Sequence, residues 1–144
     1  MKLIDCNYDK ETGESVVRIE HMKKIFVGTA MVHPDDKEQA SSYAGCSFAE
    51  TRAIIAALKY ERRKKIQKCE ECRKYLKACE QYKDFDKSSP TARCMYRQLN
   101  RRIKQVDNLS EEINELIMSL KASIIKRDLV LKAIAERKSK KDNS

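Results

Sequence analysis

The residues best suited to bind a ligand are an aromatic ring and a row of arginines in the C-terminal half of this 144-residue chain. Arginines recur at every fourth position after Phe85, on one face of an expected helix. A ring can stack on a nucleobase, and guanidinium groups bind phosphates through paired hydrogen bonds. The pattern predicts a nucleotide-binding site with six candidate residues: Phe85, Arg93, Tyr96, Arg97, Asn100 and Arg101.

A structural interpretation of the same residues stays open, in which Phe85 joins two helices and the arginines are merely solvated. A second candidate location lies upstream, where a strand, a short helix and a longer helix are expected to meet. Its candidate ligand-binding residues are His33, Asp36 and Arg52. Measuring ligand affinity in variants of Phe85 distinguishes the two locations.

Catalytic, metal and cofactor chemistry is not expected. The pair Cys69 and Cys72 forms a C-x-x-C, but it lies at helical spacing and lacks the second pair or nearby histidine of a zinc site. The stretch His33-Pro34-Asp35-Asp36 contains acid and base groups, yet no nucleophile motif or glycine-rich phosphate loop accompanies it. We therefore expect no catalytic residues, no metal and no cofactor.

Three runs of alternating residues, 2–8, 15–20 and 24–32, are separated by short turns and predict an antiparallel β-meander. The third run is apolar on both faces, so we expect it to be central or covered on both sides. Gly28 within it indicates a bulge or a close backbone approach, or a strand that simply tolerates glycine.

A short helix is expected to begin near Pro34 and to stop at Gly45. The capping box Ser47-Phe48-Ala49-Glu50 then predicts the start of a long helix that reaches residue 84. One seam of this helix is apolar: Ile55, Leu58, Cys69, Cys72, Leu76 and Cys79. Arg62 and Lys65 interrupt the seam, so the basic cluster 61–65 is either exposed or holds an anion.

Ser89-Pro90 predicts the start of a second long helix over residues 90–138. Its apolar positions recur every three or four residues: Ala92, Met95, Leu99, Ile103, Val106, Leu109, Ile113, Leu116, Ile117, Leu120, Ile124, Leu131 and Ile134. Because the second helix is longer than the first, part of its stripe would stay uncovered, which favours self-association. The basic tail 139–144 is expected to fray.

The expected fold is therefore α+β: an N-terminal antiparallel β-meander with a short helix over residues 1–45, then a coiled-coil-like helical hairpin over 46–138, in one structural unit. The composition suits long helices, since 37% of residues are charged, 41% are hydrophobic and 6% are aromatic. Residues 1–45 carry six basic and eight acidic side chains, whereas residues 46–144 carry 25 and 14, so the net charge of +9 lies in the helical part. This excess favours a polyanionic partner.

No apolar run is long enough to span a membrane, and the first residues lack the apolar core of a signal peptide. We therefore expect a soluble protein of the cytoplasm. Disulfides are rare in that reducing compartment, so all six cysteines are expected to be thiols: Cys6, Cys46, Cys69, Cys72, Cys79 and Cys94.

Several short motifs resemble the first-described family of phage Thoeris anti-defence proteins. They are Phe26-Val27-Gly28-Thr29-Ala30, His33-Pro34-Asp35-Asp36, Ala49-Glu50-Thr51-Arg52-Ala53-Ile54-Ile55, Lys83-Asp84-Phe85 and Ala92-Arg93. The resemblance implies a non-enzymatic protein that sequesters cyclic ADP-ribose isomers in the bacterial host cytoplasm and so blocks Thoeris immunity. It makes Phe85 the loop aromatic of the ligand site.

The resemblance further implies a homo-oligomer, a dimer or a hexamer, and binding of cyclic di- or trinucleotides at a second site. Where it would place an amide after the aromatic, this chain has Met95, with Gln98 and Asn100 nearby. The alternative function is that of a basic coiled-coil protein that binds nucleic acid or blocks a host protein. Salt-sensitive binding to any DNA or RNA would distinguish this alternative.

Overall fold

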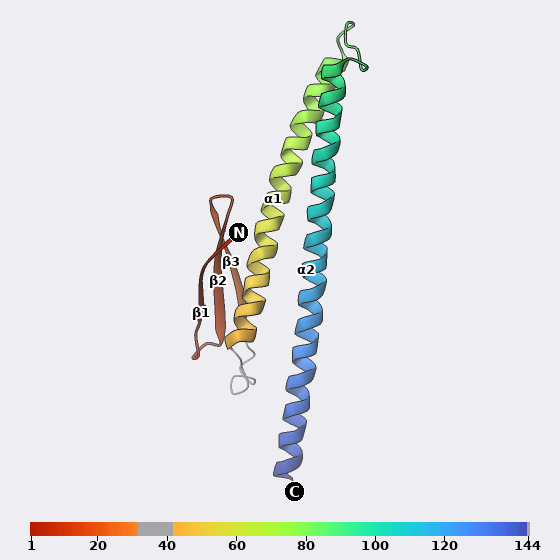
Figure 1. The fold of residues 1–144 in the computed structure, drawn as a ribbon. Helices are drawn as coiled ribbons and strands as arrows, with labels where there is room; N and C mark the ends of the chain where they lie inside the picture. Colours follow the sequence, from red (N-terminus) through yellow and green to blue (C-terminus); the bar gives the residue numbers. More distant parts are fainter. Residues whose placement is uncertain (32–41, 144) are drawn as a thin grey trace. The chain divides into compact units, whose positions relative to one another are not determined.

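The chain is an α+β protein in which a three-stranded antiparallel sheet precedes two long helices (Figure 1). The structure is a computed structural model that describes residues 1–31 and 42–143. Strands β1 (Lys2–Tyr8), β2 (Glu14–His21) and β3 (Lys24–Met31) pair in the order β1-β2-β3, which confirms the predicted meander. Helix α1 spans Ser42–Glu80 and helix α2 spans Pro90–Asp142.

Each hairpin turn of the sheet has a local cause. Between β1 and β2, the Asp9 carboxylate accepts the Glu11 amide at 2.9 Å, and Gly13 adopts a left-handed φ of 74°. Between β2 and β3, Met22 and Lys23 both have positive φ, 52° and 62°. Two left-handed residues form the type of two-residue turn whose twist matches that of the flanking strands. The tight turn brings the ends of β2 and β3 into register.

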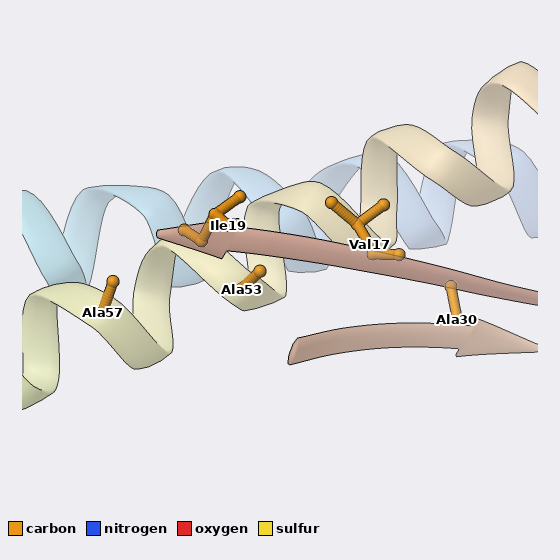
Figure 2. Close-up of a cluster of buried hydrophobic side chains, with 6 residues drawn as sticks. Val17, Ile19, Ala30, Ala53 and Ala57 are labelled. Carbon is orange, nitrogen blue, oxygen red and sulfur yellow. The ribbon is translucent and has the colours of Figure 1, made fainter. Parts of the chain in front are cut away.

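The core of the sheet lies between its inner face and the first part of α1. Val17 and Ile19 of β2 are 1% and 2% exposed, and Ala30 of β3 is also buried. They pack against an alanine row of α1 that consists of Ala49, Ala53 and Ala57 at four-residue spacing. Figure 2 labels Ala53 and Ala57. Alanines leave little side-chain bulk on this face of α1, so the helix backbone can lie close to the strands.

Gly28 shows how close this approach is. A Cβ atom at Gly28 would lie 1.8 Å from the Ala49 carbonyl oxygen and 2.6 Å from the Ala53 amide nitrogen. Both neighbours are helix backbone and cannot move aside as a flexible side chain could. Of the interpretations open from the sequence, the structure therefore supports a close backbone approach.

The expectation that the third strand is central or covered on both faces is wrong. Within the described part of the chain β3 is an edge strand, and β2 is the central one. The outer face of β3 carries Ile25, Val27 and Met31, which are 60%, 53% and 72% exposed. Apolar residues on both sides of a strand do not require that both faces are buried, because single exposed apolar side chains are common on protein surfaces.

The helix stop at Gly45 and the capping box at Ser47-Phe48-Ala49-Glu50 are also wrong, because both lie inside α1. The Ser47 carbonyl accepts the Thr51 hydroxyl at 3.0 Å, one helical turn along. Gly45 has a packing role instead, since a Cβ atom there would lie 2.3 Å from the Ser15 hydroxyl oxygen. The glycine thus lets α1 pass close to β2. The short helix expected near Pro34 lies outside the described residues.

The prediction that all six cysteines are thiols is wrong for two of them. Cys6 of β1 and Cys46 of α1 form a disulfide with a Cα–Cα distance of 6.4 Å. Sequence spacing gave no sign of this pair, because the sheet brings the two residues together across a separation of 40 positions. The remaining four cysteines are free, as expected: Cys69, Cys72, Cys79 and Cys94.

The chain divides into two compact units, Leu58–Ile113 and the remainder, Met1–Ala57 with Asn114–Ser144. In the first, the two helices run antiparallel and side by side on either side of the loop (Figure 1). All thirteen positions of the predicted α2 stripe are buried or half-buried, with Ala92 and Ile113 the most deeply buried. On α1 the seam is buried at Ile55, Leu58, Cys69 and Leu76. The predicted helical hairpin is therefore confirmed.

Neither described helix is apolar enough along its length to cross a membrane.

Candidate functional site

The loop that joins α1 to α2 is built from successive short hydrogen-bonded turns. The Tyr82 amide donates to the Cys79 carbonyl, and the Phe85 amide donates to the Tyr82 carbonyl, both at 3.1 Å. The Asp86 carboxylate accepts the Ser88 hydroxyl at 2.6 Å and the Ser88 amide at 2.9 Å. These bonds favour the charged carboxylate and lower the pKa of Asp86. The loop backbone is therefore fixed locally.

The start of α2 follows the predicted pattern. The Ser89 hydroxyl accepts the Ala92 amide at 3.2 Å, and Pro90 is the first helical residue. A serine cap satisfies one of the amides that have no partner in the first turn, and proline at this position loses no hydrogen bond. The cap fixes where α2 begins and hence which residues of its first turns face outward.

Phe85 lies in this loop with its ring half-buried. The residue is thus neither fully exposed nor fully buried, which is compatible both with stacking on a base and with packing in the hairpin. Tyr82, three residues earlier, is 73% exposed. The sequence interpretation passed over Tyr82, although a second aromatic in the same loop was a usable signal.

Arg93, Arg97 and Arg101 are exposed on α2, as the spacing predicts. In the described ranges 1–31 and 42–143, none of these guanidinium groups has an ion-pair or hydrogen-bond partner. The sequence between Asp86 and Asp107 contains no acidic residue. Residues 90–106 of α2 therefore carry basic side chains and no acidic ones, and such an excess of positive charge attracts anions.

Tyr96 and Asn100 differ in how available their polar groups are. The Tyr96 hydroxyl donates to the Glu80 carboxylate at 2.5 Å across the hairpin. This hydrogen bond, with desolvation and the negative charge of Glu80, raises the pKa of Tyr96. Asn100 is exposed one turn further along. Its amide is thus accessible beside the arginine row, whereas the Tyr96 proton already has an acceptor.

The second candidate location is only partly described. The Arg52 guanidinium donates to the Thr29 carbonyl of β3 at 2.7 Å, so it satisfies a main-chain acceptor in the edge strand. Arg52 belongs to the compact unit that contains the sheet, whereas Phe85 and the arginine row belong to Leu58–Ile113. His33 and Asp36 lie outside the described residues. Of these three candidates only Arg52 is described, and it belongs to a different compact unit from the loop residues.

The basic cluster 61–65 is partly engaged within the hairpin. Arg62 donates to the Ser110 hydroxyl at 3.4 Å, and Lys65 donates to the Gln105 side-chain oxygen at 3.3 Å. Both cations are half-buried, and both partners are neutral groups on α2. The two interruptions of the apolar seam are therefore polar contacts between the helices.

The cysteine pair at Cys69 and Cys72 lies within α1, where Cys69 is 4% exposed. Among the described residues, no three His, Cys, Asp or Glu side chains gather in a way that could hold a metal ion. A buried cysteine on the apolar seam packs as a small hydrophobic residue.

The loop and the first turns of α2 therefore carry a half-buried phenylalanine, an exposed tyrosine, three arginines without a partner in the described part of the chain, and an exposed asparagine. No family model, no curated protein and no solved structure matches this chain.

Proposed function

We propose that the protein binds a cyclic ADP-ribose-type nucleotide at the hairpin loop and sequesters it without cleaving it. The observation that carries this proposal is a row of exposed arginines, Arg93, Arg97 and Arg101, whose guanidinium groups have no partner among the described residues and which lie on the helix that follows the loop of Phe85. A nucleotide diphosphate needs cationic donors for its phosphates and an aromatic surface for its base. The accessible Asn100 amide can add a hydrogen bond to a base or ribose.

The biological setting of the proposal comes from the resemblance to phage Thoeris anti-defence proteins. In that setting the protein acts in the bacterial host cytoplasm and lowers the free concentration of an immune signal. Silencing by sequestration requires tight binding and slow release, not bond cleavage. The proposed function is accordingly not enzymatic.

The proposal is tested by recovering the ligand after binding. The protein is incubated with a cyclic ADP-ribose isomer, separated from free nucleotide and then heat-denatured. Sequestration releases the intact isomer in stoichiometric amount. A cleaved product would contradict it in favour of an enzyme, and absence of binding would reject it. Arg97→Gln and Arg63→Gln provide a matched pair, since both arginines are exposed on hairpin helices and only Arg97 belongs to the proposed site.

A second candidate function is sequence-independent binding of nucleic acid. The hairpin unit Leu58–Ile113 holds 16 basic and nine acidic residues, a net charge of 16 − 9 = +7 out of the total of +9. Binding of this kind falls steeply as salt increases, because it releases counterions from the phosphates. Tight binding of the cyclic nucleotide together with negligible affinity for duplex DNA or RNA would contradict nucleic-acid binding as the function. Cyclic di- and trinucleotides belong in the same binding screen.

We also propose that the protein is a homo-oligomer, a dimer or a hexamer. Met118, Ile125 and Leu129 of α2 are 71%, 60% and 63% exposed and lie on one face at spacings of seven and four residues. A stripe of this kind is typically covered by another helix. Sedimentation at micromolar concentration tests this, and a monomeric mass would contradict it.

A further inference from the structure

The Cys6–Cys46 disulfide connects the edge strand β1 to the beginning of α1. It is the one covalent cross-link among residues 1–31 and 42–143. The Cys6 side chain is exposed and that of Cys46 is half-buried. A thiol in solution can therefore approach the bond from the side of the exposed residue Cys6.

Contacts that do not depend on the bond position both cysteines. Cys6 pairs in register with Val17, whose side chain is 1% exposed in the core. Gly45, the neighbour of Cys46, lies against Ser15 so closely that a Cβ atom there would be 2.3 Å from the hydroxyl oxygen. Val17 and Ser15 belong to the same strand, so β2 places both partners. After reduction, renewed pairing of β1 with β2 would therefore bring the two thiols back together, so that the bond can form again.

Beyond its backbone pairing with β2, strand β1 is held by an ion pair between Asp5 and Arg18 of β2. None of its residues is in the buried core of the described chain. Leu3 and Ile4 are 53% and 43% exposed, and the pairing with β2 is irregular between Leu3 and Asp5. An edge strand with few apolar contacts opens readily, so a cross-link at its middle changes its local stability strongly.

We propose that Cys6–Cys46 is a reversible redox latch that holds β1 against the protein when oxidised and releases it when reduced. The thiolate of a reductant such as glutathione attacks the sulfur of Cys6, the S–S bond breaks, and Cys46 leaves as a thiolate that takes up a proton. A second glutathione then displaces Cys6, so the protein gains two electrons and the reductant becomes its own disulfide. Reoxidation by glutathione disulfide runs the same steps in reverse.

The test uses the full chain equilibrated at a series of ratios of reduced to oxidised glutathione. Alkylation of thiols followed by peptide mass spectrometry measures the fraction cross-linked, and hydrogen exchange measures opening. The cross-linked fraction should follow the ratio in both directions. Reduction should speed exchange of the β1 amides at least about tenfold, with that of the hairpin loop unchanged.

Three results would overturn the latch. They are a cross-link that millimolar glutathione leaves intact, reduction without faster exchange in β1, and reoxidation that joins Cys6 to a cysteine other than Cys46. Cys6→Ser and Cys46→Ser should both resemble the reduced protein and no longer respond to glutathione. Cys94→Ser, which removes an exposed free thiol, is the matched control and should keep the full response. If a serine variant fails to fold, hydrogen exchange of β1 in the reduced, unaltered protein still tests the latch.

Discussion

The hydroxyl of Tyr96 donates a hydrogen bond to the carboxylate of Glu80 and so joins the second turn of α2 to the last residue of α1. The loop that carries Phe85 lies between these two residues in sequence. The hydrogen bond therefore closes the loop at its base. The stability of the hairpin should therefore change with pH when Tyr96 ionises.

Tyr96 should ionise later than an ordinary tyrosine, because its pKa is raised above 10.0 by the hydrogen bond to Glu80. The folded pKa exceeds the unfolded value, so the stabilisation is complete below pH 10.0 and is lost as pH rises through the raised pKa. An ultraviolet titration of the phenols should show a delayed ionisation that belongs to Tyr96. It should vanish in Tyr96→Phe and persist in Tyr75→Phe, an exposed tyrosine of α1. A delayed step that remains in Tyr96→Phe would contradict the assignment.

Phe85→Ala should weaken nucleotide binding by about 5- to 150-fold, the value of a base stack of about 1 to 3 kcal/mol. Because the ring is only half-buried, the loss of stability should stay below the roughly 3 kcal/mol of a fully buried phenylalanine. Calorimetric titration and urea unfolding measure the two effects. Phe85→Leu keeps an apolar side chain without the aromatic face, so it should lose affinity and retain stability. A variant that loses stability while the folded fraction binds normally would favour the packing role.

Arg97→Gln should weaken binding of the nucleotide by roughly 10- to 150-fold, since hydrogen bonds to charged groups contribute about 1.5 to 3 kcal/mol. Its remaining affinity should depend less on salt, because one ionic contact is gone. Arg93→Gln should behave alike, and Arg63→Gln should bind normally. Titrations at two salt concentrations measure this. If the Arg93, Arg97 and Phe85 variants all bind the nucleotide as tightly as the unaltered protein does, the binding site lies elsewhere.

Gly28→Ala should destabilise the sheet unit by about 3 kcal/mol or more, because the added methyl group overlaps the backbone of α1. Urea unfolding followed by circular dichroism measures the loss. Thr29→Ala changes the next residue, which is exposed, and should shift stability by less than about 1 kcal/mol. Similar stabilities for the two variants would show that α1 does not lie against β3 at this point.

Ser15→Ala should stabilise the protein by about 1 kcal/mol. The Ser15 hydroxyl is fully buried and has no hydrogen-bond partner in the described structure, so its removal ends a desolvation cost. Ser15→Ala should also reduce the loss of stability caused by Gly45→Ala, because it removes the hydroxyl oxygen that lies nearest to the new methyl group. A double-mutant cycle measures this coupling. Additive effects would mean that Gly45 and Ser15 do not touch.

The parts of the fold that the sequence predicts correctly are those governed by local periodicity. Alternation located the three strands, and the apolar stripe from Ala92 to Ile134 located α2 and its buried side. The wrong predictions at Gly45 and at the cysteines share a cause, which is contact between elements that are far apart in the sequence. Gly45 resembles a helix stop because its true neighbour, Ser15, is on another element, and Cys6 shows no link to Cys46 until the sheet has formed.

The candidate site shows the same division. Phe85 falls in the loop and the arginine row is exposed on α2, as spacing predicts. The pairing of Tyr96 with Glu80 depends on the register of the two helices, which no short-range pattern specifies. Whether the residues bind a nucleotide stays a prediction.

The contact between β3 and the alanine row of α1 limits how this protein can evolve. A side chain at Gly28 would overlap the backbone of α1. Ala49, Ala53 and Ala57 are fully buried opposite the strands. Larger residues at any of these positions would separate the helix from the sheet. These four positions should therefore accept fewer substitutions than exposed positions outside the proposed site. Distant relatives should therefore share a glycine in the third strand followed by alanines at every fourth position of the helix, even where all other similarity has been lost.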